Sequence, residues 1–155
     1  KRGADRHYPL MKEKQIKELM KSVLEDKVAD NAHMYMWCAN NHIPEGLRIM
    51  EHLGFKYITN LVWAKSRFGL GRYFRGQHEI CLFGTKGRGW GVRSDSNNVP
   101  SLLGGALISP TAHSKKPNEM YDLIEKRSNG PYLEMFARNE RSGWDSWGDE
   151  IDSKD

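Results

Sequence analysis

The spacing of apolar residues predicts three helices in this chain. Apolar side chains recur at steps of three and four between residues 12 and 30, the pattern of an amphipathic helix. A second helix is expected over residues 42–55, with Pro44 near its start and Gly54 at its end. A third is expected over residues 116–128, where Pro117 marks the start and the apolar residues form one face.

Short apolar runs between these helices predict the strands. They cover residues 31–40, 56–66, 78–87 and 131–137, and a further short strand is predicted at 106–109. Because strands alternate with helices, the pattern predicts an α/β domain with a largely parallel sheet. In such sheets ligands bind beyond the carboxyl ends of the strands.

The stretch 134–150, EMFARNERSGWDSWGDE, combines arginines, two tryptophans, two glycines and a closing acidic pair. A surface helix would not accommodate the glycines, and a disordered tail would not carry Phe136, Trp144 and Trp147. The stretch starts in the last predicted strand and runs past its carboxyl end. We therefore expect a ligand site there, built from loops that follow strands.

Length, charge and cysteine content narrow the class of protein. The 155 residues fit one domain, taken as 1–155, and the net charge of +4 permits a nucleic-acid partner without requiring one. Cys38 and Cys81 lie in apolar runs and are expected to be reduced thiols, which favours an intracellular protein. No apolar run approaches the ~20 residues of a membrane span, so no membrane partner is expected. No Cys/His spacing indicates a zinc site, so no metal is expected.

Two segments, RFGLGRYFRGQ and TKGRGWGVR, interleave basic residues with aromatic residues and glycines. This mixture suits a nucleic-acid contact. Arg72 and Arg75 in the first segment, and Arg88 and Arg93 in the second, are expected to contact phosphates. Glycine-rich segments lack the rigidity that base readout needs. A solvated or subunit-packing role for these loops is the alternative.

Six further segments, taken together, resemble one family of enzymes. In chain order they are ADRHYPLM, MYMWCAN, LGFKYITNLVWAKS, GQHEICLFGTKG, SKKPNEMYDLIEK and YLEMFARNERSGWDSWGDE. This ordered set resembles the adenine-N6 methyltransferases typified by the catalytic subunit of the eukaryotic mRNA adenosine methyltransferase, which include bacterial and phage DNA-methylating members. The resemblance implies a Rossmann-like methyltransferase sheet with the cofactor strand late in the chain, and S-adenosylmethionine as the cofactor.

The resemblance also implies a cofactor site around the last predicted strand. Its expected residues are Lys116, Phe136, Arg138, Asn139, Asp149 and Glu150. Lys116, just before a helix start, is expected to contact the methionine carboxylate, and the helix N-terminus adds positive charge. Glu150 is expected to accept hydrogen bonds from the ribose hydroxyls. Asp149 stands where relatives commonly carry Asn, which leaves its role open.

On the substrate side, Tyr8 and Glu79 match positions that line the target-base pocket in the family. Tyr8 is expected to stack on a flipped adenine. Glu79 is expected either to accept a proton from the base or sugar, or to form a salt bridge at the strand start. The loop over residues 67–76 serves protein partners in the family, which implies a homo- or hetero-oligomer.

One departure from the family concerns catalysis. The Asp-Pro-Pro-Trp catalytic signature is absent, although the resemblance places it directly upstream of the RHYPLM segment. We therefore expect an incomplete copy of a longer enzyme, without its N-terminal catalytic strand and with its catalytic motif upstream of Lys1. The alternative is a partner subunit that has lost its chemistry.

The expected function is transfer of a methyl group from S-adenosylmethionine to the N6 amine of adenine in DNA. The DNA substrate is preferred because the ending RSGWDSWGDE looks like that of bacterial and phage members. The alternatives are the same reaction on RNA and a non-catalytic nucleic-acid-binding subunit. The expected location is the cytoplasm for a bacterial or phage protein and the nucleus for a eukaryotic one.

Overall fold

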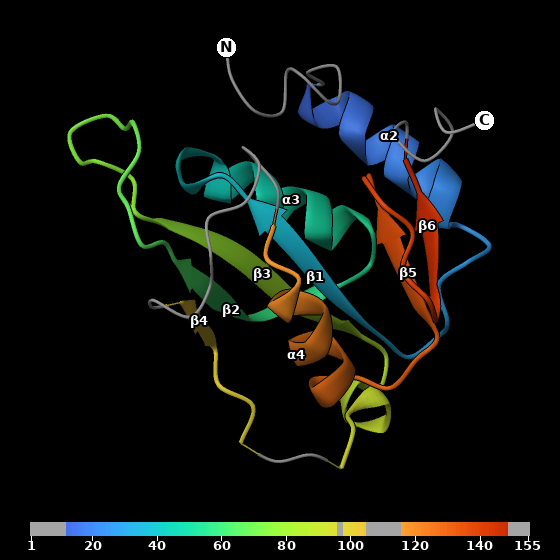
Figure 1. Cartoon of the computed structure of the whole chain (residues 1–155). Helices are drawn as coiled ribbons and strands as arrows, with labels where there is room; N and C mark the ends of the chain where they lie inside the picture. The colour runs from blue at the N-terminus through green and yellow to red at the C-terminus, as the bar shows by residue number, and fades with distance from the viewer. Residues whose placement is uncertain (1–11, 96–97, 105–115, 149–155) are drawn as a thin grey trace.

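The structure is a computed structural model that describes residues 12–95, 98–104 and 116–148. The predicted site residues Tyr8, Asp149 and Glu150, and the predicted strand at 106–109, lie outside the described residues. The elements, in chain order, are α2 (Glu13–Leu24), β1 (Ala32–Cys38), the 3-10 turn η1 (Asn40–His42), α3 (Ile43–His52), β2 (Lys56–Ala64), β3 (His78–Lys86), the 3-10 turn η2 (Gly89–Val92), β4 (Leu102–Gly104), α4 (Glu119–Arg127), β5 (Tyr132–Met135) and β6 (Trp144–Trp147) (Figure 1).

The three predicted helices and the four longer predicted strands are confirmed, with shorter bounds. Helix α2 ends at Leu24, six residues before the predicted end, and α3 has its proline in the first turn. Strands β4 and β6 were not predicted. Both are short, with three and four residues, so neither shows a clear alternation of apolar and polar positions.

The prediction of a largely parallel sheet is wrong. The described strands form a four-stranded sheet in the order β1-β3-β2-β4 and a separate two-stranded sheet of β5 and β6. Strand β3 is antiparallel to both β1 and β2, and only β2 with β4 and β5 with β6 are parallel. The reason lies in residues 65–77, which form no helix between β2 and β3. Without a crossover helix, the chain turns back and pairs antiparallel to the strand it has left.

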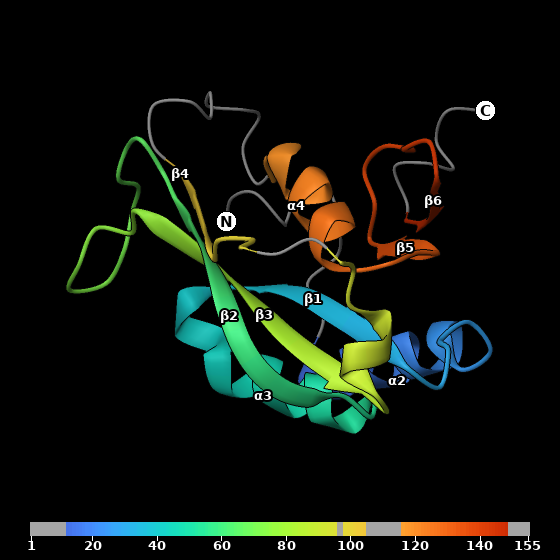
Figure 2. The same ribbon diagram turned by 90° about the horizontal axis from the view of Figure 1, so that it is seen from below.

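The four-stranded sheet is covered on both faces, which explains the continuous apolar run in the inner strand β3. Neighbouring residues of β3 point to opposite faces, so Leu82 packs with Met50 of α3 and Cys81 packs with Met120 of α4. Figure 2 shows α3 on one side of the sheet and α4 on the other. Leu82 and Cys81 are at most 2% exposed, so this three-layer arrangement contains the core.

The two-stranded sheet is attached through a second apolar cluster. Met20 and Leu24 of α2 and Ile49 of α3 form its buried part. Leu133 and Met135 of β5 pack against it. Helix α2 thus links α3 to the sheet that carries the predicted cofactor strand.

Both cysteines are free, as predicted, although only Cys81 is fully buried. Burial raises the pKa of the Cys81 thiol to about 12, so this sulfur is a neutral part of the core.

Candidate functional site

The carboxyl ends of β1 and β2 meet the start of β3 at one edge of the main sheet. Cys38 lies opposite Ile80, and Ala64 lies opposite His78. Glu79 is therefore placed at the edge where ligands bind in α/β folds. Lys65 directly follows β2 and reaches the same edge.

Glu79 is the centre of a three-residue ion cluster. Its carboxylate lies 2.5 Å from the Nζ atom of Lys116 and 2.6 Å from the Nζ atom of Lys65. Burial, the largest single influence, raises the pKa of Glu79, but the two ammonium groups together lower it below its usual value. Of the two roles expected for Glu79, the salt bridge describes its contacts here, and Lys65 and Lys116 are its partners.

Two indole rings line the cluster. The Lys116 ammonium lies 5.3 Å from the Trp37 ring centre, and the Lys65 ammonium lies 5.1 Å from the Trp63 ring centre. The two rings meet edge to face with centres 6.3 Å apart. Cations over aromatic faces are held by the ring quadrupole, so the indoles fix where both positive charges sit.

The cluster, with two ammonium groups and one carboxylate, carries a net charge of +1. The side chain of Lys116 is 32% exposed and that of Lys65 is 38% exposed, so both are accessible to solvent and to an anionic ligand. An incoming carboxylate would compete with Glu79 for the lysines, because ammonium groups bind carboxylates through charge-assisted hydrogen bonds. This edge is therefore chemically suited to an anionic group beside an aromatic surface.

Phe136, Arg138 and Asn139, the predicted cofactor residues that follow β5, lie at the end of the small sheet and not in the strands that carry Glu79 and Lys65. Phe136 has a φ of 58°, in the left-handed region that non-glycine residues seldom adopt, and its ring meets Trp147 edge to face at 5.3 Å. The backbone N–H of Ala137 donates to the carbonyl of Trp147. Arg138 is half-buried and Asn139 is exposed. Strained backbone of this kind gathers at functional sites, and here it lies at the end of β5, the predicted cofactor strand.

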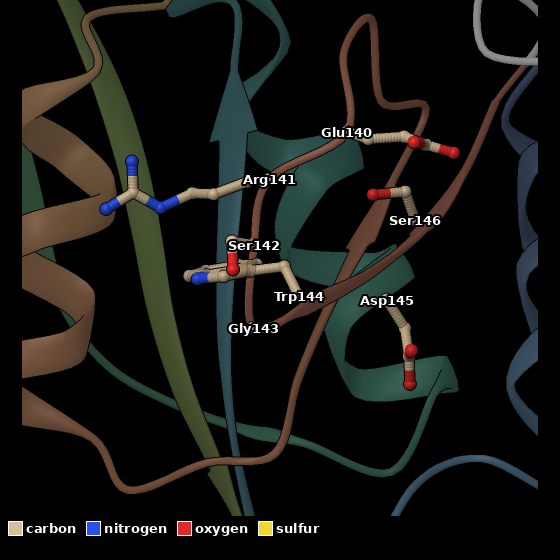
Figure 3. Close-up of a pocket in the computed structure, with 7 residues that line it drawn as sticks. All are labelled: Glu140, Arg141, Ser142, Gly143, Trp144, Asp145 and Ser146. Atoms are coloured by element: carbon tan, nitrogen blue, oxygen red, sulfur yellow. The ribbon is translucent and has the colours of Figure 1, made fainter.

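A pocket of about 480 Å³ lies at the other end of the small sheet (Figure 3). It is lined by residues 140–146, and the pairing of Trp144 with Tyr132 places these residues at the amino ends of β5 and β6. None of the predicted cofactor residues that the structure describes lines it. We therefore do not assign the cofactor to this pocket.

One wall of that pocket has a structural role. Figure 3 shows Arg141 and Trp144 pointing to the same side, away from Glu140 and Asp145. The Trp144 ring stacks on Tyr132 with centres 4.8 Å apart, and its Nε1–H donates to Glu125 at 2.8 Å. These contacts attach the turn before β6 to helix α4.

The four predicted phosphate-binding arginines separate into two pairs. Arg72 and Arg75 precede β3, and Arg88 and Arg93 follow it. Nine residues of extended strand separate the two ends of β3 by roughly 27 Å. Only Arg72 and Arg75 lie at the edge that carries Glu79, and all four side chains are exposed.

Sequence reasoning missed Lys65, the second cation on Glu79. Its signal was weak, because a lone lysine after a strand is usually solvated. The sequence did place Lys65 two residues after Trp63, near the carboxyl end of a predicted strand, where ligand sites form.

Within residues 12–95, 98–104 and 116–148, no group of three or more His, Cys, Asp or Glu side chains is placed to hold a metal ion. Among the helices in that same part of the chain, none has the length and apolar character that crossing a membrane requires.

Comparison with known proteins places the chain in a family. The sequence model of the MT-A70 family matches residues 1–150. The Type II methyltransferase M.MunI of Mycoplasma sp is 35% identical over 146 residues, which cover 93% of this chain and 60% of that protein. A putative N(6)-adenosine-methyltransferase MT-A70-like protein of Medicago truncatula is 29% identical over 130 residues, 76% of this chain and 20% of that protein.

The catalytic subunit METTL3 of the human N(6)-adenosine-methyltransferase is 25% identical over 134 residues, 79% of this chain and 22% of that protein. The chain therefore spans less than two thirds of the length of each of these relatives. The family predicted from the six sequence segments is confirmed: the chain belongs to the MT-A70 family of N6-adenine methyltransferases.

Proposed function

We propose that this chain belongs to an S-adenosylmethionine-dependent methyltransferase that modifies the N6 amine of adenine in DNA. The observation that carries the proposal is the cluster of Lys65, Glu79 and Lys116 at the carboxyl edge of the sheet in a member of this family. A cofactor with a carboxylate and a substrate with a flat base both find complementary groups there.

The residues of the cluster, together with those at the end of β5, would bind the cofactor and orient it toward the adenine. Lys116 would hold the cofactor carboxylate, and Phe136 and Arg138 would contact the cofactor from the end of β5. The cofactor supplies an activated methyl group when it is bound. The exocyclic amine of adenine is a weak nucleophile because its lone pair is delocalised into the ring, so most of the catalytic gain must come from alignment. Trp37 and Trp63 hold the two lysines in fixed places, which serves that alignment.

The amine-activating turn would come from outside this chain's described strands. Among the described residues, β1 pairs only with β3, and β5 pairs only with β6. We infer that the catalytic strand, with its Asp-Pro-Pro-Trp turn, belongs between these two sheets and joins them. Its acidic side chain would accept a hydrogen bond from the adenine amine.

The preference for DNA is supported by sequence identity. Over matches of at least three quarters of the chain, it is more similar to a Type II methyltransferase, 35% over 146 residues, than to the Medicago truncatula and human N(6)-adenosine-methyltransferases, 29% over 130 residues and 25% over 134. The same reaction on RNA adenosine is the second candidate, because the plant and human relatives are named N(6)-adenosine-methyltransferases and adenosine is a ribonucleoside.

The test uses the full-length protein and calorimetry with S-adenosylmethionine. Lys116→Ala should weaken binding about 10- to 100-fold, the effect of a lost hydrogen bond to a charged group. Lys21→Ala, an exposed lysine on α2, is the matched control and should bind normally. Unchanged affinity in Lys116→Ala would remove the carboxylate-binding assignment.

The reaction itself is tested by tritium transfer to an adenine-containing DNA duplex and to an RNA of the same sequence. We expect transfer to DNA by the full-length protein and none by the 155 residues alone. Transfer to RNA alone would select the second candidate. Transfer by the bare chain would show that the chemistry is placed wrongly.

A further inference from the structure

The loop over residues 87–93 presents a tryptophan and two arginines to solvent, away from the Glu79 edge. Trp90 is 78% exposed, and the guanidinium carbon of Arg93 lies 4.4 Å from its ring centre. Arg88 and Arg93 are themselves exposed. Since one face of the indole carries Arg93 while most of the residue is exposed, the other face is accessible.

Both ends of this loop are held by hydrogen bonds to two separate parts of the chain. The Arg88 N–H donates to the Asn31 side chain at 2.7 Å. At its far end, the Asn129 N–H donates to the Val92 carbonyl at 2.8 Å. An isolated antiparallel bridge pairs Arg93 with Ser128. A loop that contains three glycines is thus fixed at both ends.

The middle of the loop is fixed by His33 of β1. Its Nε2 atom lies 2.7 Å from the Gly89 carbonyl, and its Nδ1 atom lies 2.5 Å from the Ser128 hydroxyl. A carbonyl only accepts, so Nε2 carries the proton and Nδ1 accepts from Ser128. Tyr35 then donates to the Ser128 oxygen at 2.8 Å.

His33 itself is held by its surroundings. Its ring meets Phe83 edge to face with centres 5.0 Å apart, and Ser128 is only 3% exposed. The relay from Tyr35 through Ser128 to His33 therefore ends on Gly89, the residue next to Trp90. This makes His33 a positioning residue for the exposed indole.

We propose that residues 87–93 form a preorganised platform for single-stranded nucleic acid, with a base stacked on Trp90 and phosphates on Arg88 and Arg93. An indole face stacks only on a base that is not already paired and stacked in a duplex, and it does so with any base. Because the loop is already ordered, little conformational entropy is lost on binding.

The platform lies at the opposite end of β3 from Glu79, roughly 27 Å away along the strand. It would therefore hold the nucleic acid outside the edge where methyl transfer is proposed. The biological use of the platform rests on the proposed nucleic-acid substrate. Binding of a single strand to the platform does not depend on methyl transfer.

The test is fluorescence anisotropy of the full-length protein with a short oligothymidylate and with a duplex of equal length, over a salt series. Trp90→Ala should weaken binding of the single strand about 5- to 150-fold, the range for loss of one stacked base. Trp90→Phe should retain most of the affinity. The duplex should be affected far less by either change.

The arginines and His33 give distinct signatures. Replacing Arg88 and Arg93 by glutamine should lower the salt slope for the single strand by about 1.4 units. The same replacement of Lys14 and Lys21 on α2 is the matched control and should leave the slope unchanged. His33→Ala should weaken single-strand binding without changing the salt slope, and His33→Gln, which can still donate to Gly89, should recover part of it.

Two outcomes would overturn the platform. One is wild-type affinity of Trp90→Ala for the single strand. The other is an equal loss for single strand and duplex, which would mean phosphate contact alone. Failure of the methyltransferase proposal is read separately, from calorimetry with S-adenosylmethionine and from tritium transfer.

Discussion

Two loops of nearly the same composition behave differently in this molecule. The loop over residues 65–77 and the loop over residues 87–93 both mix arginine, aromatic residues and glycine. In the first, backbone hydrogen bonds join the loop to itself: the Lys65 N–H donates to the Gln77 carbonyl at 2.8 Å, and the Gly69 N–H donates to the Gly76 carbonyl at 2.7 Å. It projects from the edge of the sheet (Figure 1), and Tyr73 and Phe74 are almost fully exposed.

The loop over residues 87–93 bonds instead to β1, to the chain before β1 and to the end of α4. Glycine content alone therefore does not decide whether a loop is mobile. What decides it is whether the backbone groups find partners in the rigid body of the protein. The prediction that glycine-rich segments lack rigidity took no account of the hydrogen bonds that hold the second loop.

The largest difference is expected in limited proteolysis with trypsin. Cleavage after Arg72 and Arg75 should precede cleavage after Arg88 and Arg93 by a factor on the order of 10²–10³. Opening the second loop breaks several hydrogen bonds, at about 1 kcal/mol each. Mass spectrometry of early fragments measures the order of the cuts. Equal rates at both loops would abolish the comparison.

Removal of the relay should destabilise the protein strongly. His33→Ala leaves the buried Ser128 O–H without its acceptor and the Gly89 carbonyl without the His33 donor, which should lower the free energy of unfolding by about 2–4 kcal/mol. Replacing residues 68–75 by a short turn should change it by less than about 1 kcal/mol. Urea unfolding measures both variants. A larger cost for the shortened loop would show that it supports the body after all.

A smaller loss of stability is expected from substitution of Gly87, the first residue of the loop over residues 87–93. Gly87 has a φ of 63°, and a Cβ atom there would lie 2.3 Å from the Asp30 carbonyl oxygen. Gly87→Ala should therefore cost about 1–3 kcal/mol of stability. Gly91→Ala, in the same loop, is the control: its Cβ would meet nothing closer than 4.0 Å, so thermal unfolding should show little change.

The smallest effect is expected from pH. Burial, and to a lesser degree the charge of Arg127, lowers the pKa of His33 below 6.5, against the Gly89 hydrogen bond that raises it. The unfolded chain then binds more protons than the folded one between the lowered pKa and about 6.5. Stability should fall as the pH falls through this window, with the full loss below the folded pKa.

Urea midpoints measured across this pH range should show that slope in the wild type and less of it in His33→Gln. The variant in which a short turn replaces residues 68–75 should keep the wild-type slope, because His33 is untouched. Identical slopes in the wild type and His33→Gln would assign the pH response to other groups.

The sequence alone determined the three helices, the four longer strands and the family. Periodicity and punctuation identify α3 and β2 because these signals are local: the repeat of apolar residues and the limits set by Pro44 and Gly54 act within a few residues. Ordered segments likewise carried the resemblance to a family that matches residues 1–150.

The tertiary structure alone decided the direction of the strands, the partner of each charge and the rigidity of each loop. Lys116 meets Glu79, 37 positions earlier, and His33 meets Ser128, 95 positions later. The four arginines, which form one set in sequence, lie at opposite ends of β3. Pairings of this kind depend on how distant segments pack, and local residue patterns carry no record of which distant backbone or side-chain group will be the partner.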